Sequence, residues 1–181
     1  MSVLPKFGLL PKSHLVPDVL AENLDIVFCG TALGHKSALE KAYYAHPGNL
    51  FWKTLYKTGL TPQLIAPKDY AQVLSYRIGL TDLCKHAFGN DNVLPPDALD
   101  AVARDELEKK ILKYQPRFLA FTSKTAASTF LARPTGKIPY GLQVETCGNT
   151  QVSVLPSPSG QGRTYWNNGA EWHHLAGLAR N

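Results

Sequence analysis

Short apolar runs alternate along this chain with longer segments in which apolar residues recur every three or four positions. Residues 25–29 (DIVFC), 117–123 (RFLAFTS) and 151–156 (QVSVLP) have the length and apolar content of buried strands. Residues 79–83 (GLTDL) read as a short strand or an extended turn. Because Gly30 follows the first run directly, that strand is expected to lead into a loop.

The intervening segments favour helices. Residues 37–45 are compatible with a helix, Asn49 is placed to cap a helix that Gly59 ends, and Pro67 opens another helix through Tyr76. The longest predicted helix covers residues 97–114. Its expected core face consists of Leu99, Val102, Leu107, Ile111 and Leu112.

The last third of the chain continues the alternation. Ser123 is placed to cap a helix that begins at Lys124, residues 134–148 read as a loop rich in glycine and proline, and a final helix contains Trp172. Strands that alternate with helices predict an α/β fold: a single-domain, three-layer α/β/α structure with a short, mostly parallel central sheet. Residues 1–19, interrupted by three prolines, are expected to form an extended arm, and residues 20–181 the domain.

Composition sets limits on the class of protein. The chain is 44% hydrophobic and 18% charged, as in ordinary globular proteins, and no apolar run approaches the ~20 residues that a membrane helix requires. We therefore expect a cytoplasmic protein, associated with the nucleoid if bacterial, that does not enter a membrane. Three cysteines without metal-ligand spacing predict neither a zinc site nor a disulfide framework. The net charge of +5 permits a polyanionic partner.

Ligands of open α/β sheets bind at the carboxyl ends of the strands. Four segments are therefore expected at one rim: residues 30–37, 81–82, 123–124 and 157–163. Together they supply backbone amides, hydroxyl groups, a carboxylate and basic side chains.

The first of these segments, FCGTALGHKSA at 28–38, lies close to the pattern of a phosphate-binding loop. A P-loop has four residues between its first glycine and the Gly-Lys-Ser/Thr, whereas here Gly30 and Gly34 are too close and His35 separates Gly34 from Lys36. The strand RFLAFTS also lacks the aspartate expected at a magnesium-binding strand end. An enzyme that binds nucleoside triphosphates is a weak alternative on these grounds.

Three motifs in order, CGTALGHKSA, YYAHPGNLFW (43–52) and VLPSPSGQGR (154–163), together with YRIGLTDL between them, resemble the mismatch-specific uracil-DNA and thymine-DNA glycosylase family. The resemblance covers residues 20–163 and implies the uracil-DNA glycosylase-like fold. It also implies DNA as partner, no cofactor, no metal, and a role in base excision repair. A monomer is the default expectation.

The resemblance assigns roles to matching positions. The first motif shapes a pocket for a base swung out of the DNA stack, and Tyr44 stacks on that base; the alternative is that Tyr43 and Tyr44 only pack in the core. Ser157 contacts the base or sugar, and Gln161 enters the duplex. The pocket residues are Gly30, Thr31, Ala32, Leu33, Gly34, Tyr44 and Ser157; the DNA-binding residues are Lys36, Lys124, Ser159, Gly160, Gln161, Gly162 and Arg163.

One departure affects the chemistry. Relatives commonly carry Gly-Ile-Asn-Pro-Gly in the first motif, where the asparagine positions the attacking water, but this chain has Ala32 at that position and Leu33 in place of proline. A carboxylate can stabilise a cationic sugar and orient water. Asp82 is the best candidate for this catalytic role; the alternative is an aspartate that only satisfies local turn amides.

The sequence therefore predicts a monofunctional glycosylase that hydrolyses the N-glycosidic bond of uracil, or of other deaminated or mismatched bases, in duplex or single-stranded DNA. No lysine suited to forming a Schiff base beside the pocket stands out. Because Ala32 replaces the asparagine, a catalytically weak or inactive DNA-binding homologue of the same fold is the alternative.

Overall fold

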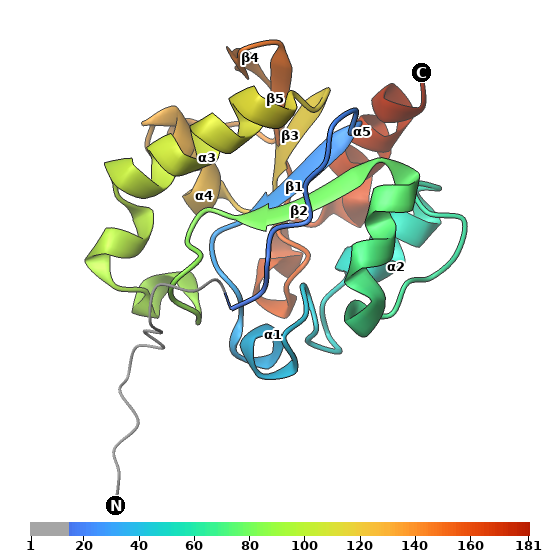
Figure 1. Cartoon of the computed structure of the whole chain (residues 1–181), viewed down its shortest axis with the longest axis horizontal. Coiled ribbons are helices and arrows are strands. Elements are labelled where there is room, and N and C mark those ends of the chain that lie inside the picture. The colour runs from blue at the N-terminus through green and yellow to red at the C-terminus, as the bar shows by residue number, and fades with distance from the viewer. Residues whose placement is uncertain (1–14) are drawn as a thin grey trace, which may run out of the picture.

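The computed structural model describes residues 15–181, and its centre is one five-stranded sheet in the order β2-β1-β3-β5-β4 (Figure 1). The parallel strands are β1 (Ile26–Gly30), β2 (Ile78–Asp82), β3 (Phe118–Phe121) and β5 (Thr150–Val154). The edge strand β4 (Gly141–Cys147) runs antiparallel to β5. Since β1 lies between β2 and β3, the carboxyl ends of three neighbouring strands meet at one rim.

Within residues 15–181, five α-helices and six 3₁₀ segments lie between the strands and after β5. The α-helices are α1 (His35–Glu40), α2 (Phe51–Lys57), α3 (Ala101–Tyr114), α4 (Lys124–Leu131) and α5 (Ala170–Arg180). The 3₁₀ segments are η1 (Pro67–Tyr76), η2 (Asp91–Val93), η3 (Pro96–Leu99), η4 (Thr135–Lys137), η5 (Gly160–Tyr165) and η6 (Asn167–Gly169).

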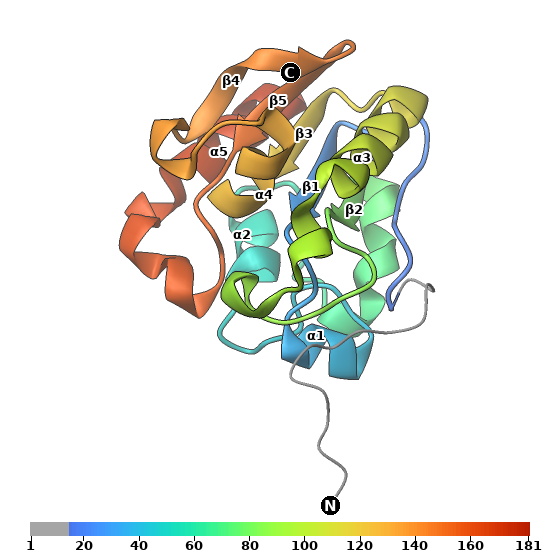
Figure 2. The same ribbon diagram turned by 90° about the vertical axis from the view of Figure 1, so that its left-hand side faces the viewer.

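Helices cover both faces of the sheet (Figure 1, Figure 2). On one face, Phe28 packs against Phe51 of α2 and Trp172 of α5, with ring centroids 5.2 and 5.4 Å away. On the other face, α3 and α4 contribute Leu107, Ile111, Ala126 and Ala127 to a second core. Strands buried on both faces explain why the strand residues form continuous apolar runs. The predicted three-layer α/β/α fold with a mostly parallel sheet is confirmed.

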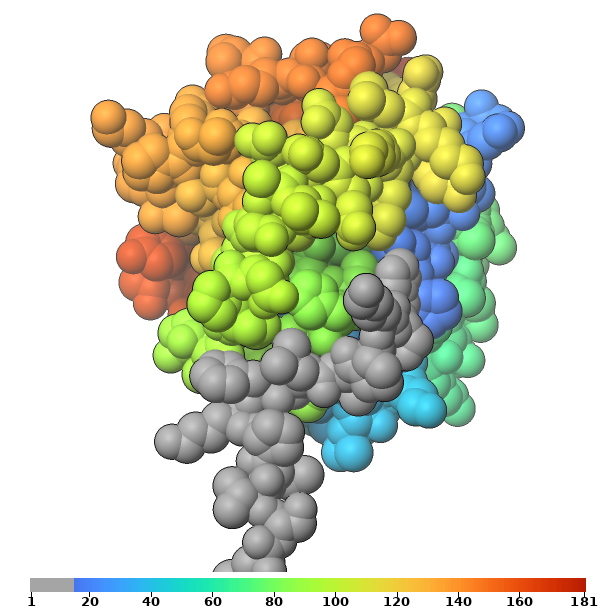
Figure 3. All heavy atoms as spheres, turned by 60° about the vertical axis from the view of Figure 1, so that its left-hand side comes forward, coloured from blue at the N-terminus to red at the C-terminus, as the bar shows by residue number. Residues whose placement is uncertain are grey.

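Figure 3 views the molecule from the side of α3, which covers this face of the sheet in yellow-green. At the β2 edge, the backbones of Val19 and Leu80 exchange two hydrogen bonds, of 2.8 and 2.9 Å. Val16 and Val19 are buried in the core. The described part of the predicted arm, residues 15–19, therefore closes an edge of the sheet, while residues 1–14 of that arm lie outside the described residues.

Several predicted element boundaries were wrong. The predicted helix at 37–45 ends at Glu40, because Lys41 and Tyr44 both adopt left-handed backbone conformations with φ of 51°. The helix predicted at 67–76 has the expected bounds, but it is a 3₁₀ segment with a kink at Asp69. The long helix begins at Ala101, where the side chain of Asp100 accepts a hydrogen bond from the Ala103 backbone.

Two residues predicted to lie in the core are exposed, and one strand was not predicted. Val102 and Leu112 of α3 are 62% and 44% exposed, and Ala103 occupies the inner face instead. The predicted loop at 134–148 contains the strand β4. Leu142, Val144 and Thr146 of β4 all point to solvent, so the strand lacks the apolar inner face that would have identified it.

Candidate active site

A cavity of about 780 Å³ opens at the carboxyl ends of β1, β2, β3 and β5. Residues from all four segments expected at this rim line it. The lining residues from the predicted site are Gly30, Thr31, Ala32, Leu33, Gly34, Lys36, Tyr44, Asp82, Lys124, Ser157, Ser159, Gly160, Gln161 and Gly162. Arg163 is the one predicted site residue that does not line this cavity.

The end of β1 brings three side chains to one point. A Cβ added to Gly30 would lie 2.5 Å from Asp82 Oδ1 and 3.7 Å from both Thr122 Oγ1 and the Tyr44 hydroxyl. The Tyr44 hydroxyl and Thr122 Oγ1 are themselves 3.1 Å apart and hydrogen-bonded. Glycine at position 30 therefore leaves the space in which a carboxyl, a phenol and a threonine hydroxyl converge.

Asp82 combines burial with an unused acceptor. Its residue is only 4% exposed, and among residues 15–181 its Oδ2 has no hydrogen-bond partner. Burial, the largest cause, raises the pKa of the Asp82 carboxyl to about 7; the nearby Asp18 also raises it, while Lys85 and Lys110 lower it. A buried carboxyl with a free oxygen, lining a cavity and titrating near neutrality, is typical of a functional acid or base.

Tyr44 is held in a fixed orientation beside this carboxyl. Its ring stacks on Phe51 at 3.8 Å between centroids and 14° between planes. Its left-handed backbone conformation turns the ring inward from the chain that follows α1. Burial raises the pKa of the Tyr44 hydroxyl well above its ordinary value, so this group stays protonated. Phe51 covers one face of the Tyr44 ring, and Tyr44 also lines the cavity.

A buried ionic cluster lies behind the cavity on the β2 side. Asp18 forms ion pairs with Lys85 (3.0 Å) and Lys110 (2.7 Å) and accepts a hydrogen bond from Thr81 Oγ1 (2.7 Å). Lys85 also donates to the Tyr43 hydroxyl over 2.8 Å. The sequence analysis missed this cluster, since its members come from three separate segments.

The turn after β5 is fixed by short contacts. The Ser157 hydroxyl donates to Ser159 Oγ at 2.9 Å, and the Gly162 amide donates to the Ser159 carbonyl at 3.0 Å. A Cβ at Gly162 would lie 2.6 Å from the Ser157 Cβ, so the turn requires glycine there. The Leu50 amide donates to the Pro158 carbonyl at 2.8 Å, which connects this turn to the second motif, residues 43–52.

The predicted basic side chains differ in their surroundings. Lys36 pairs with Glu40 at 2.6 Å in α1, and the Lys124 ammonium lies 4.3 Å from the centre of the Tyr140 ring. Arg163 donates to the Gly48 carbonyl at 3.3 Å. Thr31 Oγ1 lies 2.7 Å from Ser123 Oγ, so that hydroxyl connects the first loop to the start of α4.

The cavity also contains residues that the sequence analysis did not select. Thr122 closes β3 beside Tyr44, and Tyr140 and Tyr165 line the outer rim. Thr122 directly precedes the predicted Ser123, so including every residue at that strand end would have found it. Tyr140 lay in the predicted loop and carried no signal.

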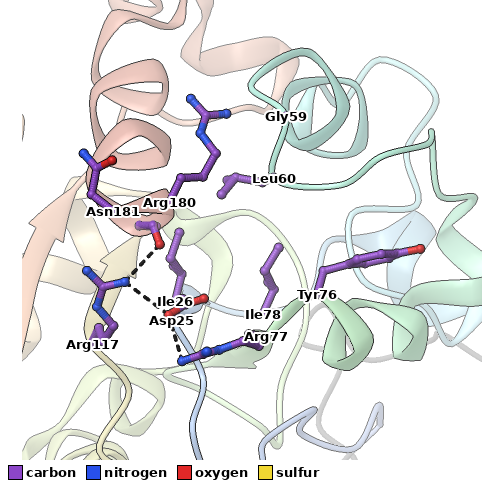
Figure 4. A pocket seen from close by; sticks show the side chains of 11 residues that line it. Asp25, Ile26, Gly59, Leu60, Tyr76, Arg77, Ile78, Arg117, Arg180 and Asn181 are labelled. Atoms are coloured by element: carbon purple, nitrogen blue, oxygen red, sulfur yellow. Dashed lines mark hydrogen bonds and ion pairs between the residues drawn. The ribbon is translucent and has the colours of Figure 1, made fainter.

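A second cavity, of about 330 Å³, lies at the opposite, amino ends of β1 and β2 (Figure 4). Arg77 and Arg117 pair with Asp25 at 3.1 and 3.3 Å. Arg117 also donates to the Ala179 and Leu178 carbonyls at the end of α5. These contacts give Arg117 a structural role that attaches α5 to the sheet, because cations at a helix C-terminus satisfy its free carbonyls.

Two kinds of feature are absent from residues 15–181. In this range no helix has the length and apolar content to cross a membrane. Within the same residues, no group of three or more His, Cys, Asp and Glu side chains has an arrangement that could hold a metal ion.

Comparisons with known proteins agree with this geometry. Residues 17–176 match the family model described as "Uracil DNA glycosylase superfamily". Among solved structures, the fold is similar to the solution NMR structure of a "putative Uracil DNA glycosylase" from Methanosarcina acetivorans, with a TM-score of 0.64 and 26% sequence identity. That match covers 92% of this chain and 97% of the other. This chain belongs to the uracil DNA glycosylase superfamily.

Proposed function

We propose that this protein is a monofunctional DNA glycosylase that hydrolyses the N-glycosidic bond of uracil extruded from DNA and leaves an abasic site. Family membership supports DNA glycosylase function in general. The observation that carries the specific proposal is that the buried Asp82 carboxyl, whose Oδ2 has no partner among residues 15–181, and the Tyr44 hydroxyl meet at Gly30 in one cavity.

Asp82 is the proposed catalytic residue. Cleavage of the bond between base and sugar develops positive charge on the sugar and negative charge on the departing base. An ionised Asp82 carboxylate stabilises the cationic sugar and orients or deprotonates the attacking water. Because Asp82 is buried, this interaction is stronger than in water, since the surrounding dielectric is lower. Asp82 thus takes over the task that the asparagine of the first motif performs in relatives, where this chain has Ala32.

Tyr44 and the first loop form the proposed base pocket. The flat face of the Tyr44 ring opposite Phe51 takes the face of the base. Gly30, Thr31, Ala32, Leu33 and Gly34 surround its edge, and backbone amides of this loop receive the developing charge on the base oxygen. Ser157, across the cavity, contacts the base or the sugar.

The turn at 157–163 and the basic side chains are the proposed DNA contacts. Gln161, carried by Ser159, Gly160 and Gly162, enters the space that the extruded nucleotide leaves and, where a partner strand is present, hydrogen-bonds the orphaned base. Lys36, Lys124 and Arg163 neutralise phosphates. Arg163 reaches the DNA beside the cavity rather than within it, since it is attached to Gly48.

The direct test is a single-turnover incubation, with enzyme in excess, of oligonucleotides that contain one uracil opposite guanine, opposite adenine, or unpaired. Alkali-labile abasic product is expected, without an enzyme adduct that borohydride can trap, because water is the nucleophile. Thymine, hypoxanthine and xanthine substrates define the range of bases. Tight binding without abasic product from any of these would show an inactive DNA-binding homologue instead.

The pH dependence of the single-turnover rate follows from Asp82. Its pKa is about 7, and the catalytic form is the carboxylate. At saturating enzyme the rate is expected to rise about tenfold per pH unit below pH 7 and to level off above it. The measurement is the rate of abasic product formation between pH 5 and pH 9. A rate that falls as the pH rises through 7 would mean that Asp82 acts as a protonated acid.

A further inference from the structure

Two tyrosines on the outer rim of the cavity have no role in the proposed reaction. Tyr140, just before β4, and Tyr165, at the end of η5, lie with ring centroids 6.3 Å apart and planes at 47°. Tyr165 is 64% exposed. A ring that exposed contributes little to folding, because hydrophobic stabilisation scales with the apolar area removed from water. Its position therefore needs another explanation.

The turns that carry both rings are fixed by local contacts. Gly141 adopts φ of +95°, and the Gln143 side chain donates to the Pro139 and Gly141 carbonyls, each at 2.9 Å, so the turn that carries Tyr140 is fixed. Trp166 packs on the buried Trp172 at 5.9 Å and anchors the end of η5. The two turns lie side by side in Figure 2, orange before β4 and red-orange after β5.

A lysine ammonium group lies beside one of the two tyrosine rings. Lys124, the first residue of α4, is half-buried and places its ammonium 4.3 Å from the centre of the Tyr140 ring. Tyr140, Tyr165 and Lys124 all line the cavity that holds Asp82 and Tyr44. Exposed aromatic faces beside a positive charge are the combination with which proteins bind single-stranded nucleic acid, since bases stack on the rings and the phosphates follow the charge.

We propose that Tyr165, supported by Tyr140 and Lys124, is a second stacking platform that binds the unpaired base of a nucleotide adjacent to the extruded one. This inference rests on the proposed function and narrows its substrate class to single-stranded or locally opened DNA. A base paired in a duplex keeps both faces stacked on its neighbours and cannot lie on Tyr165. Gln161, four residues earlier on the same turn, agrees with this preference, because a polar side chain fills the gap in a duplex less well than an apolar one.

The test is the affinity for an end-labelled single-stranded oligonucleotide whose central nucleotide is 2′-fluoro-2′-deoxyuridine, which resists glycosidic cleavage, measured by fluorescence anisotropy. Tyr165→Ala is expected to weaken binding roughly 5- to 150-fold, the loss of one base–aromatic stack. Tyr165→Phe keeps the ring and is expected to bind within about twofold of wild type. Tyr56→Ala is the matched control, since Tyr56 is 51% exposed on α2 and does not line the cavity.

Salt dependence separates stacking from charge. Lys124→Met is expected to reduce the slope of log affinity against log salt by about 0.7, whereas Tyr165→Ala leaves the slope unchanged. The affinity of Tyr165→Ala is also measured with the same oligonucleotide in a duplex. The platform would be overturned if Tyr165→Ala bound the single strand as tightly as wild type, or if it lost the same affinity for the single strand and the duplex. Because binding is measured without cleavage, a Tyr165 effect in a protein that forms no abasic product would contradict the glycosylase proposal alone.

Discussion

Replacement of Asp82 by asparagine is expected to lower the single-turnover rate of uracil release by about 100-fold or more while the affinity for DNA stays within a few-fold, the scale of a general acid–base contribution. The substitution keeps the shape of the side chain and removes its negative charge. Its Oδ2 has no hydrogen-bond partner among residues 15–181, the residue is 4% exposed, and its Oδ1 lies next to the space at Gly30, which is why we propose this carboxyl for the chemical step. The measurements are a single-turnover time course and a titration with uncleavable DNA.

Stability distinguishes a catalytic effect from a folding defect. Because the folded pKa of Asp82 is raised above its unfolded value, the folded state binds the proton more tightly, and this contribution to stability is lost as the pH rises through 7. Asp82→Asn removes that loss, so at pH 8 the variant should unfold at the same or a higher denaturant concentration than wild type. Asp105→Asn, on the solvent side of α3, is the matched control and should change neither rate nor stability. Unchanged cleavage in Asp82→Asn would leave catalysis to backbone groups.

A single methyl group at Gly30 is expected to reduce the single-turnover rate by about 10- to 100-fold, since misplacement of a reacting group by about 1 Å can cost 100-fold. The Cβ of Gly30→Ala would lie 2.5 Å from Asp82 Oδ1, closer than real contacts allow, so one of the two must move. β1 is bonded on both sides in the sheet, which leaves the carboxyl as the group that shifts. The rate is measured at saturating enzyme, with folding checked by denaturant unfolding.

Gly136→Ala is the control for that substitution. Gly136 lies in η4 away from the cavity, and a Cβ there would meet no atom within 4 Å. It should cleave and unfold as wild type does. If Gly30→Ala also retained the wild-type rate with a normal structure, the space between Gly30 and Asp82 would have no part in the reaction.

Most of the fold could be predicted from short apolar runs that alternate with helical patterns along the chain. β1 and β3 are buried along their whole length and read as continuous apolar runs, β2 is buried but ends in Thr81 and Asp82, and β5 exposes Gln151; the helices between the strands follow from the alternation. The edge strand β4 could not be read this way, because Leu142 and Val144 face solvent between Pro139 and Gly148. The early end of α1 depends on tertiary packing: the left-handed turns at Lys41 and Tyr44 allow both Tyr43 and Tyr44 to face inward.

The sequence predicted which segments lie at the site, because the ends of the strands determine their location. Parallel strands that end at Gly30, Asp82 and Phe121 must bring Gly30, Asp82 and the following Ser123 to one rim, and these three residues line one cavity. Side-chain direction was not available from spacing. Arg163 lies next to a cavity-lining glycine and still turns to Gly48, while Thr122 faces Tyr44. The pKa of Asp82 depends on burial and on charges close to it in space. Of these, Asp18 and Lys110 are far from Asp82 in the sequence, and no local sequence pattern connects them or Lys85 to Asp82.

The central claim is that one cavity holds an extruded base between Tyr44 and the first loop, with the sugar beside Asp82. The most direct measurement is a crystal structure of the protein with an oligonucleotide that contains 2′-fluoro-2′-deoxyuridine. The uracil ring is predicted to lie parallel to Tyr44 on the side opposite Phe51, with its C1′ next to the Asp82 carboxyl. A uracil that remains stacked in the DNA, or that binds away from Tyr44 and Asp82, would contradict this account.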